Sequence, residues 1–203
     1  MAKILQASRN SIEKAAKVIK NGGLVVIPTD TLYALSGSAL EKGVIKKVYW
    51  VKGRNYNKPL SIMFHSLLQA KKYVKLNKLT LKLVKEFLPG PLTIVVQMKY
   101  KFPKELTFGS PKVGIRIPNN ELALEIIKEC KIPLIATSAN VSGNKDPISA
   151  DDATKQIGDK VDLILDSGKC IYSRPSTVVE VLNDGIKILR KGVIPKKSLK
   201  SII

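Results

Sequence analysis

Residues 21–35, NGGLVVIPTDTLYAL, contain a helix end, a buried strand and a polar loop in direct succession. Asn21-Gly22-Gly23 is typical of a helix end, because glycine accepts the backbone conformation that stops helical hydrogen bonding. Leu24–Ile27 is an uninterrupted apolar run of strand length, and Pro28 ends it. The stretch therefore predicts a helix followed by a core strand, which is typical of α/β proteins.

The same alternation continues along the chain. Before the stretch, Asn10 or Ser11 can cap a helix whose apolar stripe runs from Ile12 to Ile19. Further helices are expected over 44–51, 67–74, 79–88, 121–129 and 151–157. Strands are expected over 24–27, 60–64, 93–98, 112–117, 134–136, 161–165, 177–182 and 186–189. The pattern predicts one α/β domain over residues 1–203, with a twisted, mixed (parallel and antiparallel) open sheet flanked by helices.

The composition excludes several classes of protein. With 203 residues, 44% of them hydrophobic, the chain can bury a sizeable core. Its apolar runs fall well short of the roughly 18 residues of a membrane span, and its first residues form no apolar leader. Cys130 and Cys170 lie far apart with no nearby histidine, so neither a disulfide framework nor a zinc site is expected. We expect a cytoplasmic globular protein with reduced, partly buried thiols and no membrane association.

The net charge of +19 has two possible explanations. Most of the 35 basic residues are lysines, and a lysine surplus suits polyanionic partners such as nucleotides or RNA. It equally suits the solvated surface of a lysine-biased or thermophilic proteome. Charge alone does not identify a partner, but the scarcity of arginine draws attention to each arginine in a distinctive local sequence.

Three polar loops adjoin predicted strands, where open α/β sheets bind ligands. They are Pro28–Leu35, Lys52–Leu60 and Thr137–Gly143. The second has three cations within seven residues, which can grip a triphosphate, but it lacks the spacing of a P-loop. Taken singly, the loops also fit a capping turn, a solvated basic loop and an Asx or Ser/Thr turn.

Arg116 stands within the apolar strand segment VGIRIP, residues 113–118. A guanidinium there is costly to bury unless it is paired or faces an anionic ligand. Because side chains alternate along a strand, Arg116 shares its face with Gly114 and Pro118, which leaves room beside it. It can hold a ligand carboxylate by two parallel hydrogen bonds, or it can be a structural arginine paired with an internal carboxylate.

Seven blocks together resemble the YrdC family of threonylcarbamoyl-AMP synthases, in that family's order and spacing. They are PTDTLYAL (28–35), KGRNYNKPLS (52–61), LPGPLTIV (88–95), VGIRIP (113–118), PLIATSANVSG (133–143), PSTVVEV (175–181) and ILRKG (188–192). The resemblance covers about residues 21–192, leaves a short tail over 193–203, and fits the minimal, single-domain form of the family. Asp30 departs from the Glu of many members. Many also carry a histidine where this chain has Met63, and we expect the lone His65 to be a surface or packing residue.

The resemblance implies a YrdC-like fold and a nucleotidyl transfer. L-threonine, bicarbonate or CO2, and ATP would give L-threonylcarbamoyl-AMP and pyrophosphate, with Mg2+ carried on the ATP phosphates and no metal ligand from side chains. The product would pass to separate proteins that modify an adenosine beside the tRNA anticodon. Such transfers depend on positioning and charge neutralisation, so they need no histidine or cysteine nucleophile.

The resemblance also implies roles for individual residues. The family's KxR…SxN signature corresponds to Lys52, Arg54, Ser138 and Asn140, the expected catalytic set. The expected threonine-binding residues are Thr31, Arg116, Ala136 and Ser176, with Arg116 on the carboxylate. The expected ATP-binding residues are Arg54, Lys58, Ser138 and Arg190.

Two other interpretations remain open. A non-catalytic RNA-binding domain of the same fold would explain the charge, and direct binding of tRNA or other structured RNA is one expectation from it. That interpretation does not explain Thr31, Arg116 or the segment 138–140. The other is an enzyme of the same fold acting on a different small substrate, such as a relative that transfers a carbamoyl group.

Overall fold

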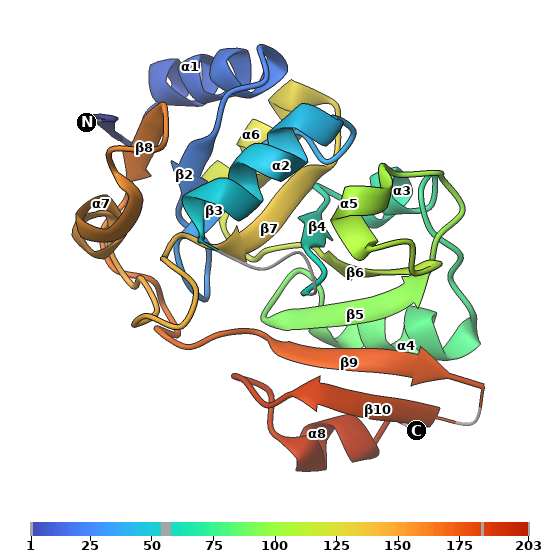
Figure 1. Cartoon of the computed structure of the whole chain (residues 1–203). Coiled ribbons are helices and arrows are strands. Elements are labelled where there is room, and N and C mark those ends of the chain that lie inside the picture. The colour runs from blue at the N-terminus through green and yellow to red at the C-terminus, as the bar shows by residue number, and fades with distance from the viewer. Residues whose placement is uncertain (1, 54–57, 184, 203) are drawn as a thin grey trace.

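The computed structural model describes residues 2–53, 58–183 and 185–202 (Figure 1). In these ranges the strands are β1 (Lys3–Gln6), β2 (Val25–Ile27), β3 (Ala34–Ser36), β4 (Ser61–Met63), β5 (Leu92–Gln97), β6 (Lys112–Arg116), β7 (Leu134–Ser138), β8 (Leu163–Asp166), β9 (Thr177–Leu182) and β10 (Gly185–Arg190). The helices are α1 (Arg9–Lys20), α2 (Lys42–Val51), α3 (Leu67–Ala70), α4 (Lys78–Phe87), α5 (Lys104–Thr107), α6 (Glu121–Cys130), α7 (Ala150–Ile157) and α8 (Lys196–Lys200).

The strands form one sheet in the order β1-β8-β2-β3-β7-β4-β6-β5-β9-β10. Parallel neighbours such as β1–β8 and β4–β6 stand beside antiparallel ones such as β3–β7 and β5–β6. This confirms the predicted mixed open sheet flanked by helices. Strands far apart in sequence meet at its centre, where β3, β7, β4 and β6 lie side by side.

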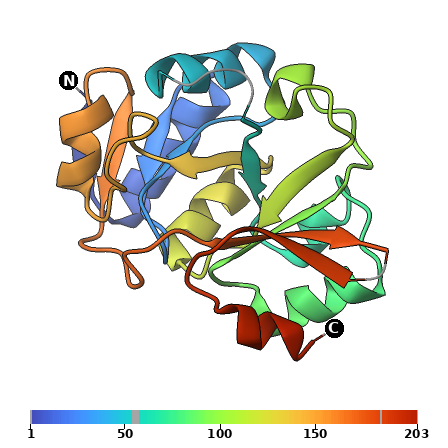
Figure 2. The ribbon, with the colours of Figure 1, turned by 60° about the horizontal axis from the view of Figure 1, so that its bottom comes forward.

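The core lies on both faces of the sheet. Val25 and Ile27 of β2 belong to an apolar cluster with Ile19 of α1 and Ile126 of α6, whereas the intervening Val26 belongs to a second cluster that includes α2 and α7. This follows from the alternation of side chains along a strand. Figure 2 shows α2 and α6 on opposite sides of β7.

Several predicted boundaries are wrong by a few residues. The cap of α1 is Ser8, not Asn10 or Ser11: the Ser8 hydroxyl accepts from the Ser11 backbone N–H, and the Ser11 hydroxyl accepts from the Ser8 N–H. The helix expected over 67–74 ends at Ala70. The short elements β1, β3, α5 and α8 were not predicted, because three to five residues show too little of any period.

The two cysteines are free, and both are buried more completely than the sequence suggested. Among the described residues, no helix combines the length and the apolar character that a membrane crossing requires.

Candidate active site

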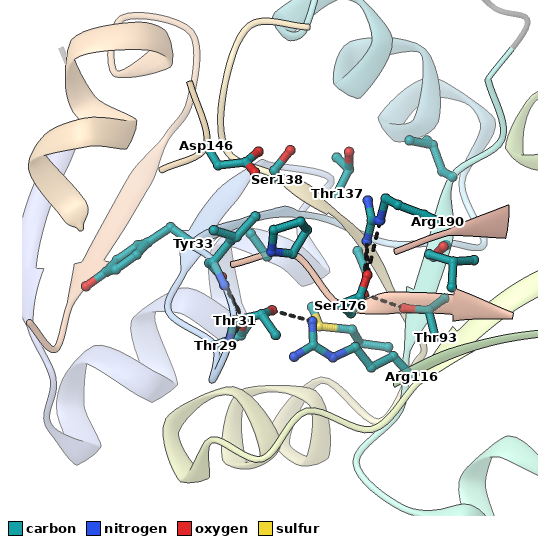
Figure 3. Close-up of a pocket in the computed structure, with 18 of the residues that line it drawn as sticks. Thr29, Thr31, Tyr33, Thr93, Arg116, Thr137, Ser138, Asp146, Ser176 and Arg190 are labelled. Atoms are coloured by element: carbon teal, nitrogen blue, oxygen red, sulfur yellow. Dashed lines mark hydrogen bonds between the residues drawn. The ribbon is translucent and has the colours of Figure 1, made fainter. Parts of the chain in front are cut away.

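A cavity of about 170 Å³ opens beside the centre of the sheet (Figure 3). Its polar lining includes Thr31, Thr93, Arg116, Ser138, Ser176 and Arg190, which come from six different segments of the chain. The walls are the loop after β2, the strands β5, β6 and β7, the start of β9 and the end of β10. The cavity therefore lies at the polar loops that the sequence indicated as candidate ligand-binding segments.

The loop between β2 and β3 is held by Thr29. Its hydroxyl accepts from the backbone N–H groups of Thr31 and Leu32, at 3.2 and 3.3 Å, and donates to the Leu32 carbonyl at 2.7 Å. The chain then turns back into β3, which pairs antiparallel with β2. The loop is a tight reversal between two strands and not a helix cap, and it leaves Asp30 and Thr31 buried.

Arg116 is bound within the protein through three of its nitrogens. Nε donates to the Gly90 carbonyl at 3.1 Å, Nη1 to the Thr31 hydroxyl at 2.6 Å, and Nη2 to Asp30 Oδ1 at 2.5 Å. Asp30 is fully buried and Arg116 is 7% exposed. The structure thus shows the pairing with an internal carboxylate that was one of the two interpretations, while the same guanidinium lines the cavity.

The electrostatics of Arg116 reflect this setting. Burial lowers the pKa of the guanidinium from its ordinary value, and the nearby charge of Arg190 lowers it further. The Asp30 carboxylate acts in the opposite direction, both by charge and by hydrogen bonding, and raises that pKa. Asp30 is therefore the group that stabilises the cation in this buried place.

A second polar cluster lines the same cavity as Arg116 (Figure 3). Arg190 donates to the Ser176 carbonyl through Nε and Nη2, at 3.1 and 2.9 Å, and to the Ser176 hydroxyl at 3.0 Å. The Ser176 hydroxyl also lies 2.9 Å from the Thr93 hydroxyl. Gly192 permits this arrangement, because a Cβ there would lie 2.4 Å from backbone atoms of residues 175–177.

Gly114 shapes the floor beside Arg116. A Cβ at this position would lie 2.5 Å from the Ser61 hydroxyl and 3.1 Å from Thr93 Cγ2, and both of those residues line the cavity. The expectation of a small residue next to Arg116 is confirmed. Any larger side chain would have to displace Ser61.

Lys52 forms a third cluster, with Ser138 and Asn140. Its Nζ donates to the Ser138 carbonyl at 2.5 Å, to the Asn140 carbonyl at 2.8 Å and to Asn140 Oδ1 at 3.0 Å. Asn140 Oδ1 also accepts from the Ser138 hydroxyl at 2.7 Å. Lys52 and Asn140 are buried, and of the three residues only Ser138 lines the cavity. In this structure Lys52 holds the loop that presents Ser138.

The remaining predicted residues divide into three groups. Ala136 lines the cavity, next to Ser138 on β7. Lys58 is exposed and does not line it, although its carbonyl accepts from the Tyr49 hydroxyl at 3.0 Å. Arg54 lies outside the described residues. His65 is half-buried just beyond β4, away from the cavity.

Three contributors were not found from the sequence. Thr93 is a polar residue in an apolar strand, which is a signal that the sequence does contain. In the sheet, the adjacent Ile94 pairs with Ile115, next to Arg116. A buried arginine also calls for a carboxylate, but the sequence analysis did not identify which one, and the structure shows that it is Asp30. No pattern in the sequence pointed to Asp146, which lines the opposite side of the cavity.

Comparisons with known proteins show which family this chain belongs to. The family model Sua5/YciO/YrdC, described as telomere recombination, matches residues 17–192. A protein of Methanocaldococcus jannaschii is 42% identical over 189 residues, which cover 93% of this chain and 88% of that protein. The threonylcarbamoyl-AMP synthase of Pyrococcus abyssi is 34% identical over 95% of this chain, and the match spans 57% of that longer protein.

A solved structure is similar over the whole chain. The crystal structure of Pyrococcus abyssi Sua5 complexed with L-threonine superposes with a TM-score of 0.95 at 32% identity. It covers 100% of this chain, which spans 61% of that one.

Proposed function

Because this chain belongs to the Sua5/YciO/YrdC family, we propose that it is a threonylcarbamoyl-AMP synthase, a nucleotidyltransferase that serves tRNA modification. The observation that carries the proposal is that Thr31, Arg116 and Ser176 all line the same cavity. Relatives over most of the chain carry this enzyme name, and one related structure was solved with L-threonine.

We place threonine in the 170 Å³ cavity. This volume is below the roughly 300–1,000 Å³ of pockets that enclose drug-sized ligands, so it suits an amino acid better than a whole nucleotide. Arg116 would bind the carboxylate, because a guanidinium matches a carboxylate with parallel hydrogen bonds. The hydroxyls of Thr31 and Ser176 also line the cavity and would form hydrogen bonds with the bound threonine.

We place ATP at the open side of the cavity, near Ser138 and Arg190. Arg54 and Lys58 are proposed to contact it as well, from the loop that follows Lys52. Mg2+ would arrive with the phosphates, since this ion is usually held by one or two carboxylates together with substrate phosphates. Among the described residues, Asp146 is the carboxylate that lines the cavity, so this proposal departs from the expectation that no side chain binds the metal. When bound, the metal would neutralise charge on the phosphates.

The proposed reaction joins three substrates without a covalent enzyme intermediate. The threonine amine adds to CO2, a C–N bond forms, and one proton leaves to give a carbamate. A carbamate oxygen then attacks the α-phosphorus of ATP, and the bond to the β-phosphate oxygen breaks to release pyrophosphate. The residues described here orient the reactants and balance their charge, which is what nucleotidyl transfer requires. Separate transfer proteins would consume the product on tRNA.

Mass spectrometry of the product tests this proposal. Protein incubated with ATP, bicarbonate and L-threonine should yield threonylcarbamoyl-AMP, and pyrophosphate release should depend on threonine. Equal pyrophosphate release with other amino acids would favour a same-fold enzyme of different substrate. Absence of any product would contradict the proposal and leave the RNA-binding interpretation, which filter binding to tRNA would then measure.

A further inference from the structure

The proposed subsites for threonine and for the triphosphate share one cavity, so this site must keep phosphate groups out of the place where the amino acid binds. Threonine at neutral pH is a zwitterion without net charge, whereas the phosphates of ATP are polyanionic. An arginine fork binds carboxylate and phosphate equally well by shape. Charge is therefore the difference between the two ligands that a site at Arg116 can use for discrimination.

The Arg116–Asp30 pair makes the site sensitive to this difference in charge between the two ligands. Asp30 Oδ1 lies 2.5 Å from Arg116 Nη2, the carboxylate is fully buried, and the guanidinium is 7% exposed. In such surroundings screening by water is weak, so the two opposite charges cancel locally. A guanidinium has five N–H groups, and the contacts to Gly90, Thr31 and Asp30 use three of them. Arg116 thus keeps donors for a ligand while the pair has no net charge.

We propose that Asp30 is a specificity-determining residue that cancels the charge of Arg116, so that the Arg116 guanidinium binds the carboxylate of a zwitterion in preference to a phosphate, while Arg190 remains a cation of the same cavity. The inference rests on the proposed function, because it assumes that threonine binds beside Arg116. Asp30 itself does not line the cavity, so it acts through Arg116.

The hydrogen bonds of Asp30 make its charge separable from its structural role. Both Arg116 Nη2 and the Asn119 backbone N–H donate to Oδ1. Among the described residues, the buried Oδ2 has no hydrogen-bond partner. An asparagine whose amide oxygen replaces Oδ1 would keep both hydrogen bonds. Asp30→Asn therefore removes the charge and leaves those contacts in place.

Calorimetry with threonine and inorganic phosphate, in the absence of ATP, tests the proposal. In wild-type protein, millimolar phosphate should leave the Kd for threonine unchanged. In Asp30→Asn, phosphate should compete with threonine and bind at least about tenfold more tightly than to wild type, which corresponds to about 1.4 kcal/mol. A merely structural role for Asp30 would weaken threonine binding and create no phosphate site.

Two control variants separate this effect from net charge. Glu13→Gln removes the charge from an exposed arginine–carboxylate pair outside the cavity, Arg9 with Glu13, and it should leave phosphate affinity at the wild-type value. The double variant Asp30→Asn, Arg116→Gln removes both partners of the pair, and it should show no gain in phosphate affinity.

Three results would overturn the inference. A folded Asp30→Asn protein that binds threonine but gains no phosphate affinity would do so. Displacement of threonine by phosphate in wild-type protein would also do so, and this measurement stands even if Asp30→Asn does not fold. A wild-type protein that binds no threonine would instead remove the proposed function, and this inference with it.

Discussion

Two buried cations beside the same cavity are compensated in opposite ways. Arg116 is paired with the carboxylate of Asp30, whereas Lys52 Nζ donates to three neutral oxygens of Ser138 and Asn140. The Arg116–Asp30 pair carries no net charge, whereas these three oxygens bring no negative charge of their own to Lys52. In the proposed function, the Arg116–Asp30 pair faces the zwitterion threonine, and Lys52 positions the loop that presents Ser138 to the triphosphate.

The contrast teaches that the total charge of this chain says little about its site. The excess of +19 comes mainly from lysines, and most of the described lysines are exposed. What distinguishes the two sides of the cavity is the identity of the acceptor that burial places next to each cation. Substitutions that change one acceptor or one cation can therefore break or sharpen the comparison.

Lys52→Met should have the largest effect. It removes the cation that joins two carbonyls and an amide oxygen, and these buried acceptors would lose a charged donor. We expect a loss of about 3 kcal/mol in the free energy of unfolding, measured by urea denaturation, together with loss of threonine-dependent pyrophosphate release. Lys58→Met is the matched control, since Lys58 is exposed and its removal should change stability by no more than about 0.5 kcal/mol. Equal stabilities for the two variants would contradict the role assigned to Lys52.

Arg116→Lys should affect one substrate only. An ammonium keeps the charge beside Asp30 but cannot reproduce the planar fork that reaches Gly90, Thr31 and Asp30 together. Threonine affinity should fall by about tenfold or more, while ATP affinity stays near the wild-type value, as measured by calorimetric titration of each ligand. Arg174→Lys, at an exposed arginine, serves as control. A loss confined to ATP would show that the two sides of the cavity have been assigned the wrong way round.

Ser176→Ala should produce a smaller loss on the side of Arg190. The Ser176 hydroxyl binds Arg190 and Thr93, but Arg190 keeps its two bonds to the Ser176 carbonyl. Threonine affinity should fall by about fivefold, near 1 kcal/mol for one hydrogen-bonding group, with pyrophosphate release still measurable. Ser201→Ala on the exposed surface is the control. An unchanged Kd for threonine would place the ligand away from Ser176.

Tyr33→Phe should have the smallest effect, and one that depends on pH. The Tyr33 backbone carbonyl accepts from the Ala139 N–H, on the Lys52 side, and its hydroxyl donates to the Gly168 carbonyl. Burial is the main cause that raises the pKa of Tyr33 to about 12.

The direction of the pH effect follows from that raised pKa. The un-ionised hydroxyl is favoured in the folded protein, so its contribution is complete below pH 10, near the unfolded value of about 10, and is lost as pH rises toward 12. At pH 8 the free energy of unfolding of the wild type should exceed that of Tyr33→Phe by less than about 1 kcal/mol. This difference, measured by urea denaturation, should become smaller between pH 10 and pH 12. A stability difference between the two proteins that stays constant from pH 10 to pH 12 would contradict this prediction.

Several features follow from local sequence. Apolar runs and helix ends indicated the main strands and helices, because burial periodicity is a property of neighbouring residues. The position of Gly114 on the same strand face as Arg116 could be predicted, since side chains alternate along a strand. The motif blocks indicated six of the residues that line the cavity: Thr31, Arg116, Ala136, Ser138, Ser176 and Arg190.

The charge compensation could be decided only by the tertiary structure. Asp30 and Arg116 lie 86 positions apart in sequence, and Lys52 reaches oxygens that lie 86 and 88 positions away. The sequence by itself determined that the buried Arg116 needs an anionic partner. The sheet order decided which one, because the strand that carries Arg116 and the loop that carries Asp30 meet only after folding. A buried charge is set by the groups within a few ångströms of it, and that distance is established by packing and not by position along the chain.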